Sequence, residues 1–299
     1  MTFAQRLQRL VATRESQIVL GLDPDPARLW AQAHERVAAA GPPAQRAASA
    51  VRAHCAAMID AVGPACVAVK PQLACFERLG ADGWAALAAT VEHAHQAGLL
   101  VIADGKRGDI DVSAAAYAQA LVGHTPTPFG DVPGLGADAF TANPLLGVDT
   151  LTPLVDGARG ADAAIFVLVR TSNPGAADVE DLELHDGERV WERLARIVAQ
   201  LAGPGDGLSE IAAVVGATSP EHVARMRELM PRSPFLLPGI GAQGGRVEDL
   251  APAFAAGRAG GLISASRSIA RAHESAGGSP ADAARAEAER LRAMAWSLG

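Results

Sequence analysis

The chain has 299 residues, of which 49% are hydrophobic, and it carries a formal net charge of −7 at pH 7. This length allows one large α/β domain or two small ones, with enough apolar residues for a sizeable core. The acidic balance, the lack of a basic tract and an aromatic content of 4% argue against nucleic-acid binding. No apolar run approaches the length of a membrane span. Three cysteines without metal-ligand spacing favour a reduced, cytoplasmic protein.

Eight short apolar runs alternate with helical patterns along the chain. The N-terminal segment is amphipathic, with Phe3, Leu7, Leu10 and Val11 on one face, and it lacks the apolar core of a signal peptide. The predicted strands cover residues 18–24, 66–70, 99–103, 139–144, 163–171, 211–216, 235–241 and 261–267. The predicted helices cover residues 43–62, 82–97, 113–122, 188–201, 219–230 and 280–297, with Ser219 as a capping residue.

This alternation predicts parallel βαβ units, and eight such units predict a (β/α)8 TIM barrel. No composition break divides the chain, so we expect a single domain over residues 1–299, with an N-terminal helix and a C-terminal closing helix. The Gly/Pro-rich segment 123–136 is predicted to be a functional or mobile loop. In this fold the carboxyl ends of the strands share one catalytic rim. The polar residues at these ends are Asp23, Lys70, Asp104, Lys106, Asn143, Ser172 and Arg267.

The two lysines of the chain, Lys70 and Lys106, both close apolar runs, and every other basic side chain that is always charged is an arginine. Arginine cannot hand over a proton, whereas lysine can. The strand ends therefore favour a site that uses an ammonium group, although surface charges at strand ends are the plainer interpretation.

Asp104, Lys106 and Asp109 follow one apolar run within six residues. A lysine about 4 Å from a carboxylate gains on the order of 4 kcal/mol at an effective dielectric of 20. Two such neighbours should keep Lys106 charged, so it would act as an acid rather than as a Schiff-base amine. Asp104 would repel a substrate carboxylate, and this repulsion vanishes if the carboxylate leaves as CO2. The alternative is a structural network of ion pairs.

Glycine-rich sequences follow the seventh and eighth predicted strands, at residues 238–245 and 264–269. Backbone N–H groups in such loops can surround an anion, and the guanidinium of Arg267 suits phosphate. TIM barrels often bind phosphate at these two loops. The alternative is that the glycines only form turns and that Arg267 pairs with a surface acid.

The remaining polar residues give weaker signals. The eight histidines fall mostly on helical or loop segments without ligand spacing, so we expect surface residues and no metal site. Cys66 and Cys75 are expected to pack in the core. Asp23 could merely cap the turn that contains Pro24 and Pro26.

Taken together, these motifs resemble the orotidine 5′-phosphate decarboxylase family. The segment 104–110 (DGKRGDI), with Lys70 one strand earlier, carries the resemblance, and residues 238–245 (PGIGAQGG) with Arg267 are similar to the family's phosphate site. The segments 19–24, 143–147 and 171–174 resemble its longer bacterial subgroup, type 2.

The resemblance implies a role for each matching residue. Lys70, Asp104, Lys106 and Asp109 would form an alternating charge network in which Lys106 protonates C6 of the pyrimidine. Asp109, with Ile110 and Ser113 beside it, would reach into the site of a second subunit, which makes a homodimer necessary. Asp23 and Lys70 would hold the ribose, Ser172 the pyrimidine amide, and Gln243 and Arg267 the phosphate. The other implied substrate-binding residues are Asn143, Pro238 and Gly244.

The reaction implied is decarboxylation of orotidine 5′-monophosphate to uridine 5′-monophosphate and CO2, with no cofactor and no metal. The loop at 238–245 is short, so the segment 179–188 is a candidate for closing over the phosphate. Magnesium-dependent sugar-phosphate decarboxylases and aldolases share the barrel and the Asp-x-Lys-x-x-Asp pattern, but Lys70 would compete with their metal. A non-catalytic nucleotide sensor would not need the proton donor Lys106.

Overall fold

Eight parallel strands close into a barrel in a computed structural model, which describes residues 1–299 except 36, 242–243 and 299. Within these described residues the strands follow the order β1-β10-β9-β8-β7-β6-β3-β2 around the barrel. Their bounds are β1 (Ile18–Leu22), β2 (Ala68–Pro71), β3 (Leu100–Arg107), β6 (Ala139–Ala142), β7 (Ala164–Arg170), β8 (Ile211–Val215), β9 (Phe235–Pro238) and β10 (Gly261–Ala265). The predicted (β/α)8 fold is confirmed.

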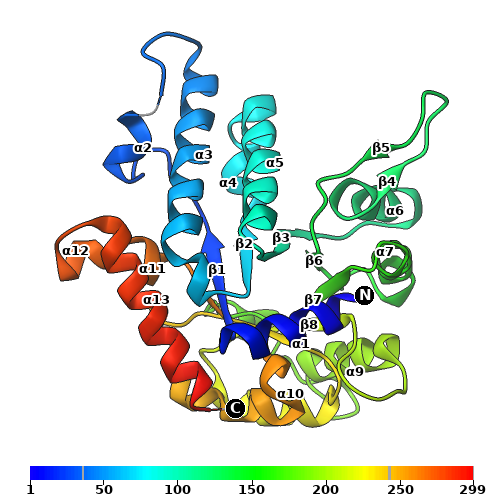
Figure 1. Ribbon diagram of the computed structural model, residues 1–299. Coiled ribbons are helices and arrows are strands. Elements are labelled where there is room, and N and C mark those ends of the chain that lie inside the picture. The colour runs from blue at the N-terminus through cyan, green and yellow to red at the C-terminus, as the bar shows by residue number, and fades with distance from the viewer. Residues whose placement is uncertain (36, 242–243, 299) are drawn as a thin grey trace.

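Helices form a ring around the barrel in Figure 1, and the N-terminal helix α1 (Phe3–Arg14) runs across the middle of that view. The α-helices are α1 (Phe3–Arg14), α2 (Ala31–Glu35), α3 (Pro43–Val62), α4 (Leu73–Glu77), α5 (Gly80–Gln96), α6 (Asp111–Leu121), α7 (Val148–Gly160), α8 (Ala176–Val179), α9 (Val190–Ala202), α10 (Pro220–Leu229), α11 (Arg267–Ala270), α12 (Ala272–Ala276) and α13 (Pro280–Trp296). The 3-10 helices are η1 (Gly63–Ala65), η2 (Val247–Ala256) and η3 (Arg258–Gly260). The described part of the chain contains no helix that is long and apolar enough to cross a membrane.

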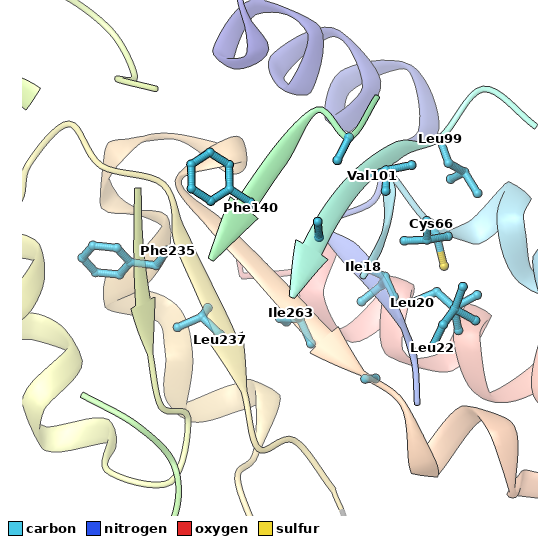
Figure 2. Packing of buried hydrophobic residues seen from close by; sticks show 14 of the residues in the cluster. Ile18, Leu20, Leu22, Cys66, Leu99, Val101, Phe140, Phe235, Leu237 and Ile263 are labelled. Carbon is cyan, nitrogen blue, oxygen red and sulfur yellow. The ribbon is translucent and has the colours of Figure 1, made fainter. Parts of the chain in front are cut away.

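The core has an outer and an inner part. Side chains that point outward from the strands, such as Ile18, Val101 and Ile263, pack under the helices (Figure 2). Side chains at the amino-terminal end of the interior pack against α1, and the rings of Phe3 and Phe166 meet edge to face at 6.0 Å. The amphipathic N-terminal helix was predicted, and it closes the end of the barrel opposite the site.

The differences from the sequence-based expectations include three local features. The third strand continues through the charged motif to Arg107 instead of ending before it. The segment 123–136 is not only a loop, because β4 (His124–Thr125) and β5 (Val132–Pro133) pair in a short antiparallel hairpin beside α6 (Figure 1). Ser219 precedes α10 at the cap position, but its side chain makes no capping hydrogen bond.

Candidate active site

A cavity of about 380 Å³ opens at the carboxyl ends of the barrel strands. Its floor is apolar, formed by Leu168, Val214 and Leu236 from three neighbouring strands. Its walls carry the polar side chains that follow the strands. The rim predicted from the strand ends therefore surrounds a cavity.

Lys70, Asp104 and Lys106 form a continuous charge network on one wall of this cavity. The Lys70 Nζ atom lies 2.5 Å from Asp104 Oδ2, and the Lys106 Nζ atom lies 2.7 Å from Asp104 Oδ1. Lys70 and Asp104 are buried, at 7% and 5% exposure, whereas the Lys106 side chain is 43% exposed. The plainer interpretation, surface charges at strand ends, is wrong for Lys70.

A distortion of β3 brings Lys106 to Asp104. Between Ala103 and Arg107 the strand advances four residues while its partner β6 advances two, so the extra residues bulge out. Lys106 adopts a positive φ of 47° within this bulge. Gly105 has no room for a side chain, because a Cβ atom there would lie 2.7 Å from Leu73 Cδ1.

Two neutral side chains complete the network, and the sequence analysis missed both. The Thr141 hydroxyl donates to Asp104 Oδ1 at 2.9 Å and accepts from the Lys106 backbone N–H at 2.9 Å. Gln72 Nε2 lies 3.4 Å from Asp104 Oδ2. Thr141 is the polar residue within the otherwise apolar strand β6. This break in the apolar pattern was the sequence feature that could have identified Thr141 as a site residue.

The network sets the protonation of its buried members. Burial by itself would raise the pKa of Asp104, but the charges of Lys70 and Lys106 hold that pKa well below its ordinary value. Burial by itself would lower the pKa of Lys70, but the attraction of Asp104 raises it above its ordinary value. The buried pair is therefore stable at neutral pH as an Asp104 carboxylate beside a Lys70 ammonium group.

Asp109 does not join this network within the chain. Its carboxylate accepts from the Ile110 backbone N–H at 2.8 Å, and no salt bridge of Asp109 occurs among the described residues. The expectation that two carboxylates hold Lys106 is therefore wrong for a single chain, where Asp104 is the carboxylate that pairs with the Lys106 ammonium group among the described residues. Ile110 and Ser113 are exposed and lie outside the cavity lining.

Part of the predicted phosphate site lines another side of the cavity. Pro238, Gly239 and Arg267 line it together, and Gly239 has a φ of 104° that favours glycine. Arg267 is exposed and makes no ion pair among the described residues, so the alternative of a surface pair is not supported. Gly244 lies outside the lining, and Gln243 lies outside the described residues.

Asp23 and Ser172 also line the cavity, as predicted. Asp23 is exposed and does not cap the following turn, because Asp25 is the residue whose side chain accepts from Ala27 N–H, at 3.2 Å. Asn143 lies outside the cavity lining, since its side chain accepts from the Leu145 backbone N–H at 3.0 Å.

A second cavity of about 340 Å³ shares Asp23 and Arg267 with the first. Its wall includes His54, which is 5% exposed, so the expectation that the histidines lie at the surface is wrong for this residue. The Trp30 backbone N–H donates to His54 Nδ1 at 3.2 Å, and burial lowers the pKa of His54 to about 4. His54 is therefore neutral at physiological pH.

Comparisons with known proteins all find similarity to one family. Residues 16–281 match the model of the family described as "Orotidine 5'-phosphate decarboxylase / HUMPS family". An orotidine 5′-phosphate decarboxylase of Rhodopirellula baltica is 40% identical over 92% of this chain and 90% of its own length. The Deinococcus radiodurans protein of that name is 43% identical over 90% of this chain and 89% of its own length. The solved structure of Leishmania donovani OMP decarboxylase is similar with a TM-score of 0.72, 33% identity and 99% coverage of both chains.

Proposed function

The chain belongs to the orotidine 5′-phosphate decarboxylase family, and from this premise we propose how its side chains carry out the reaction. The protein decarboxylates orotidine 5′-monophosphate to uridine 5′-monophosphate and CO2 in pyrimidine biosynthesis. The observation that supports our mechanism is the Lys70–Asp104–Lys106 network on the wall of the cavity.

Asp104 and Lys106 act in sequence in this mechanism. The substrate carboxylate, held near Asp104, is repelled by about 4 kcal/mol at 4 Å and an effective dielectric of 20. When the bond between C6 and the carboxylate breaks, CO2 leaves and the electron pair stays on C6. The Lys106 ammonium stabilises this carbanion and then gives it a proton, which forms the C6–H bond and leaves a neutral amine. Because its side chain is 43% exposed, Lys106 can recover a proton from water.

The remaining cavity residues bind the rest of the nucleotide in our proposal. Asp23 and Lys70 hold the ribose hydroxyls, and Ser172 contacts the pyrimidine amide. Arg267 binds the phosphate, and its exposed guanidinium at the cavity, which pairs with no acid among the described residues, supports this role. The sequence adds Gln243, and the loop residues Pro238 and Gly244 contribute backbone. Asn143, which the resemblance also implies, would need the turn after β6 to move.

We further propose that two copies of the chain form a homodimer in which Asp109 completes the partner's site. Asp109 pairs with no cation in the described part of its own chain, and its neighbours Ile110 and Val112 are 62% and 77% exposed. These apolar side chains suit an interface between copies. Ser113 follows on the same exposed turn.

Complementation between inactive variants tests the shared site. Lys106→Ala and Asp109→Ala should each be inactive alone. An equal mixture, unfolded and refolded together, should recover about one quarter of wild-type activity, because half of the dimers carry one intact site. A mixture that stays inactive, although mixed dimers form, would contradict the assignment of Asp109 to the partner's site.

The mechanism itself is tested with chelated enzyme. Protein treated with a chelator should still consume orotidine 5′-monophosphate, followed as loss of its ultraviolet absorbance. Lys106→Ala should abolish turnover and still bind uridine 5′-monophosphate. Turnover that depends on added magnesium would favour the metal-dependent alternative, and turnover by Lys106→Ala would remove Lys106 as the proton donor.

We place the protein in the cytoplasm. In support, Cys55, Cys66 and Cys75 are all free thiols, and burial raises the pKa of Cys66 to about 12. Such thiols persist in a reducing compartment.

A further inference from the structure

Two adjacent carboxylates tie the end of β7 to the segment that follows it. Arg170, which is 8% exposed, places Nε and Nη2 each 2.9 Å from an oxygen of Asp181. Its Nη1 atom donates to the Thr171 carbonyl at 3.2 Å. Glu180 accepts from the Thr171 backbone N–H at 2.8 Å, and both of its oxygens lie 3.1 Å from the Thr171 hydroxyl.

Glu180 replaces a strand partner that Thr171 lacks. The ladder between β7 and β8 ends where the Gly216 N–H donates to the Arg170 carbonyl at 2.8 Å. Beyond this point the Thr171 N–H finds its acceptor in a carboxylate. A hydrogen bond to a charged acceptor is about twice as strong as a neutral one, so Glu180 fixes the backbone at the edge of the cavity.

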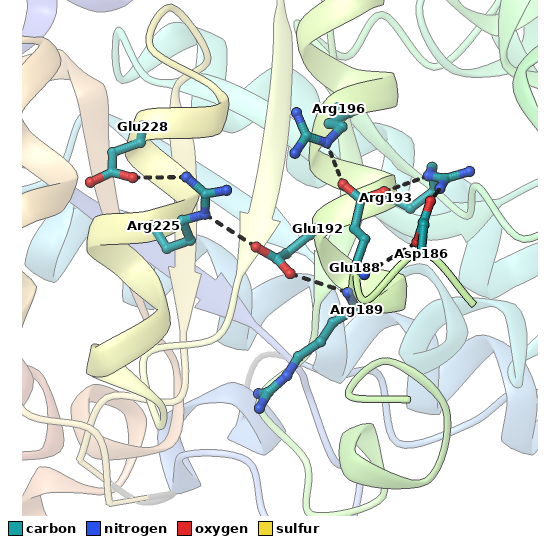
Figure 3. Close-up of polar contacts among 8 residues, drawn as sticks. All are labelled: Asp186, Glu188, Arg189, Glu192, Arg193, Arg196, Arg225 and Glu228. Atoms are coloured by element: carbon teal, nitrogen blue, oxygen red, sulfur yellow. Dashed lines mark hydrogen bonds and ion pairs between the residues drawn. The ribbon is translucent and has the colours of Figure 1, made fainter. Parts of the chain in front are cut away.

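The segment that carries Glu180, residues 172–189 (here called the insert), is itself held firmly. The Glu180 carbonyl accepts from the backbone N–H of Trp191, a residue only 3% exposed, at 2.9 Å. At the other end of the insert, Glu188 pairs with the half-exposed Arg193 and Arg196 of α9 (Figure 3). Solvent screens these pairs, so the backbone bond to Trp191 is the firmer attachment. The bond to Trp191 therefore fixes the backbone of Glu180, from which the carboxylate reaches the Thr171 N–H.

Ser172 is the residue whose position depends on this arrangement. Its carbonyl accepts from the Thr218 hydroxyl at 3.2 Å. Gly216 packs directly beneath it, since a Cβ atom there would lie 2.9 Å from both Ser172 N and Ser172 Cα. Glu180 supplies the third restraint through Thr171, the residue before Ser172, and all of these restraints act on backbone that borders the cavity.

We propose that Glu180 is a positioning residue that fixes Ser172 for contact with the pyrimidine ring, with Arg170 and Asp181 holding the insert in place. The inference rests on the proposed function, which assigns Ser172 to the ring. Glu180 thus governs the part of nucleotide affinity that depends on the base. The phosphate is held by Arg267, which belongs to α11 on another side of the cavity, so its binding is independent of Glu180.

The test compares two competitive ligands, uridine 5′-monophosphate and ribose 5-phosphate, which lacks the base. Glu180→Ala should weaken binding of the nucleotide about tenfold, the loss expected for one charge-assisted hydrogen bond, and leave ribose 5-phosphate unchanged. Glu180→Gln should retain most nucleotide affinity, because its amide oxygen can still accept from Thr171 N–H. The matched control is Glu183→Ala, an exposed acid of the same insert whose side chain makes no hydrogen bond among the described residues.

An equal loss for both ligands, or a nucleotide affinity that matches the Glu183→Ala control, would overturn the proposal. If Glu180→Ala does not fold, Asp181→Asn loosens the same insert and should give a smaller loss confined to the nucleotide. Wild-type protein that binds both ligands without consuming orotidine 5′-monophosphate would overturn the proposed function. The ratio of the two affinities would still report on Glu180 in that case.

Discussion

Two of the networks of charged side chains in the described part of the chain are built from different cations. The network at the barrel mouth uses lysines, and its central Asp104 is 5% exposed. The network on α9 and α10 uses Arg193, Arg196 and Arg225, paired with acids near the surface (Figure 3). Arginine offers a planar fork and keeps its proton, whereas lysine offers a point charge that can give a proton away. In these two networks, lysine stands where a proton can be transferred, and arginine stands where a fixed positive charge is sufficient.

Exchanging the cations should have its largest effect at the barrel mouth. Lys106→Arg keeps the positive charge but removes the transferable proton, so we expect decarboxylation to fall about a thousandfold or more. Binding of uridine 5′-monophosphate should remain measurable by calorimetry. The matched exchange Arg193→Lys should leave turnover unchanged, and substantial activity in Lys106→Arg would contradict proton donation by this residue.

Removing the shared carboxylate tests how far the buried network depends on its pairing. Asp104→Asn leaves the Lys70 ammonium buried without a countercharge, which should cost about 3–5 kcal/mol in urea unfolding at pH 7. Adding Lys70→Met should recover part of this loss, because an apolar side chain needs no countercharge. A double variant less stable than Asp104→Asn would contradict this explanation.

The stabilising effect of Asp104, measured against the same Asp104→Asn variant, should depend on pH. The lowered pKa of Asp104 gives stability that is present above about pH 4, its unfolded value, and is lost as pH falls through the folded value. The raised pKa of Lys70 gives stability that is present below about pH 10.4 and is lost as pH rises through the folded value. The stability gap between wild type and Asp104→Asn should therefore be flat near neutrality and narrow at both extremes.

The two networks also differ in the backbone beneath them, since α9 is regular and β3 bulges at Gly105. Gly105→Ala places a Cβ atom 2.7 Å from Leu73 Cδ1, which should cost about 1–3 kcal/mol of stability. The shift of Lys106 that accompanies it should lower kcat more than affinity for uridine 5′-monophosphate. An unchanged kcat would show that the bulge does not position Lys106.

The sequence predicted the barrel and three members of the network because local patterns carry both. Apolar runs mark the strands, and Lys70, Asp104 and Lys106 stand where those runs end. Contacts between distant segments leave no such pattern, which is why Gln72 was missed.

Other misses have equally physical causes. The local pattern predicted a second carboxylate beside Lys106, but Asp109 pairs with no cation among the described residues, and its carboxylate accepts from the Ile110 backbone N–H instead. The bulge that carries Lys106 depends on pairing with β6, and the burial of His54 depends on Trp30 and the second cavity. The roles of Glu180 and Arg170 arise only when the insert folds back on β7.

The smallest effect is expected on the outer face, where the arginine network meets water. Glu188 accepts from Arg193 and Arg196, but both arginine side chains are about half exposed, at 48% and 56%, so solvent screens the pairs. Glu188→Gln should lower Tm by no more than about 2 °C, and 1 M salt should remove most of that difference. Thermal unfolding of both proteins at low and high salt measures it, with turnover unchanged throughout. A large loss of Tm that persists in 1 M salt would mean that the arginine network stabilises the fold as strongly as the lysine network does. The contrast between the two networks would then be wrong.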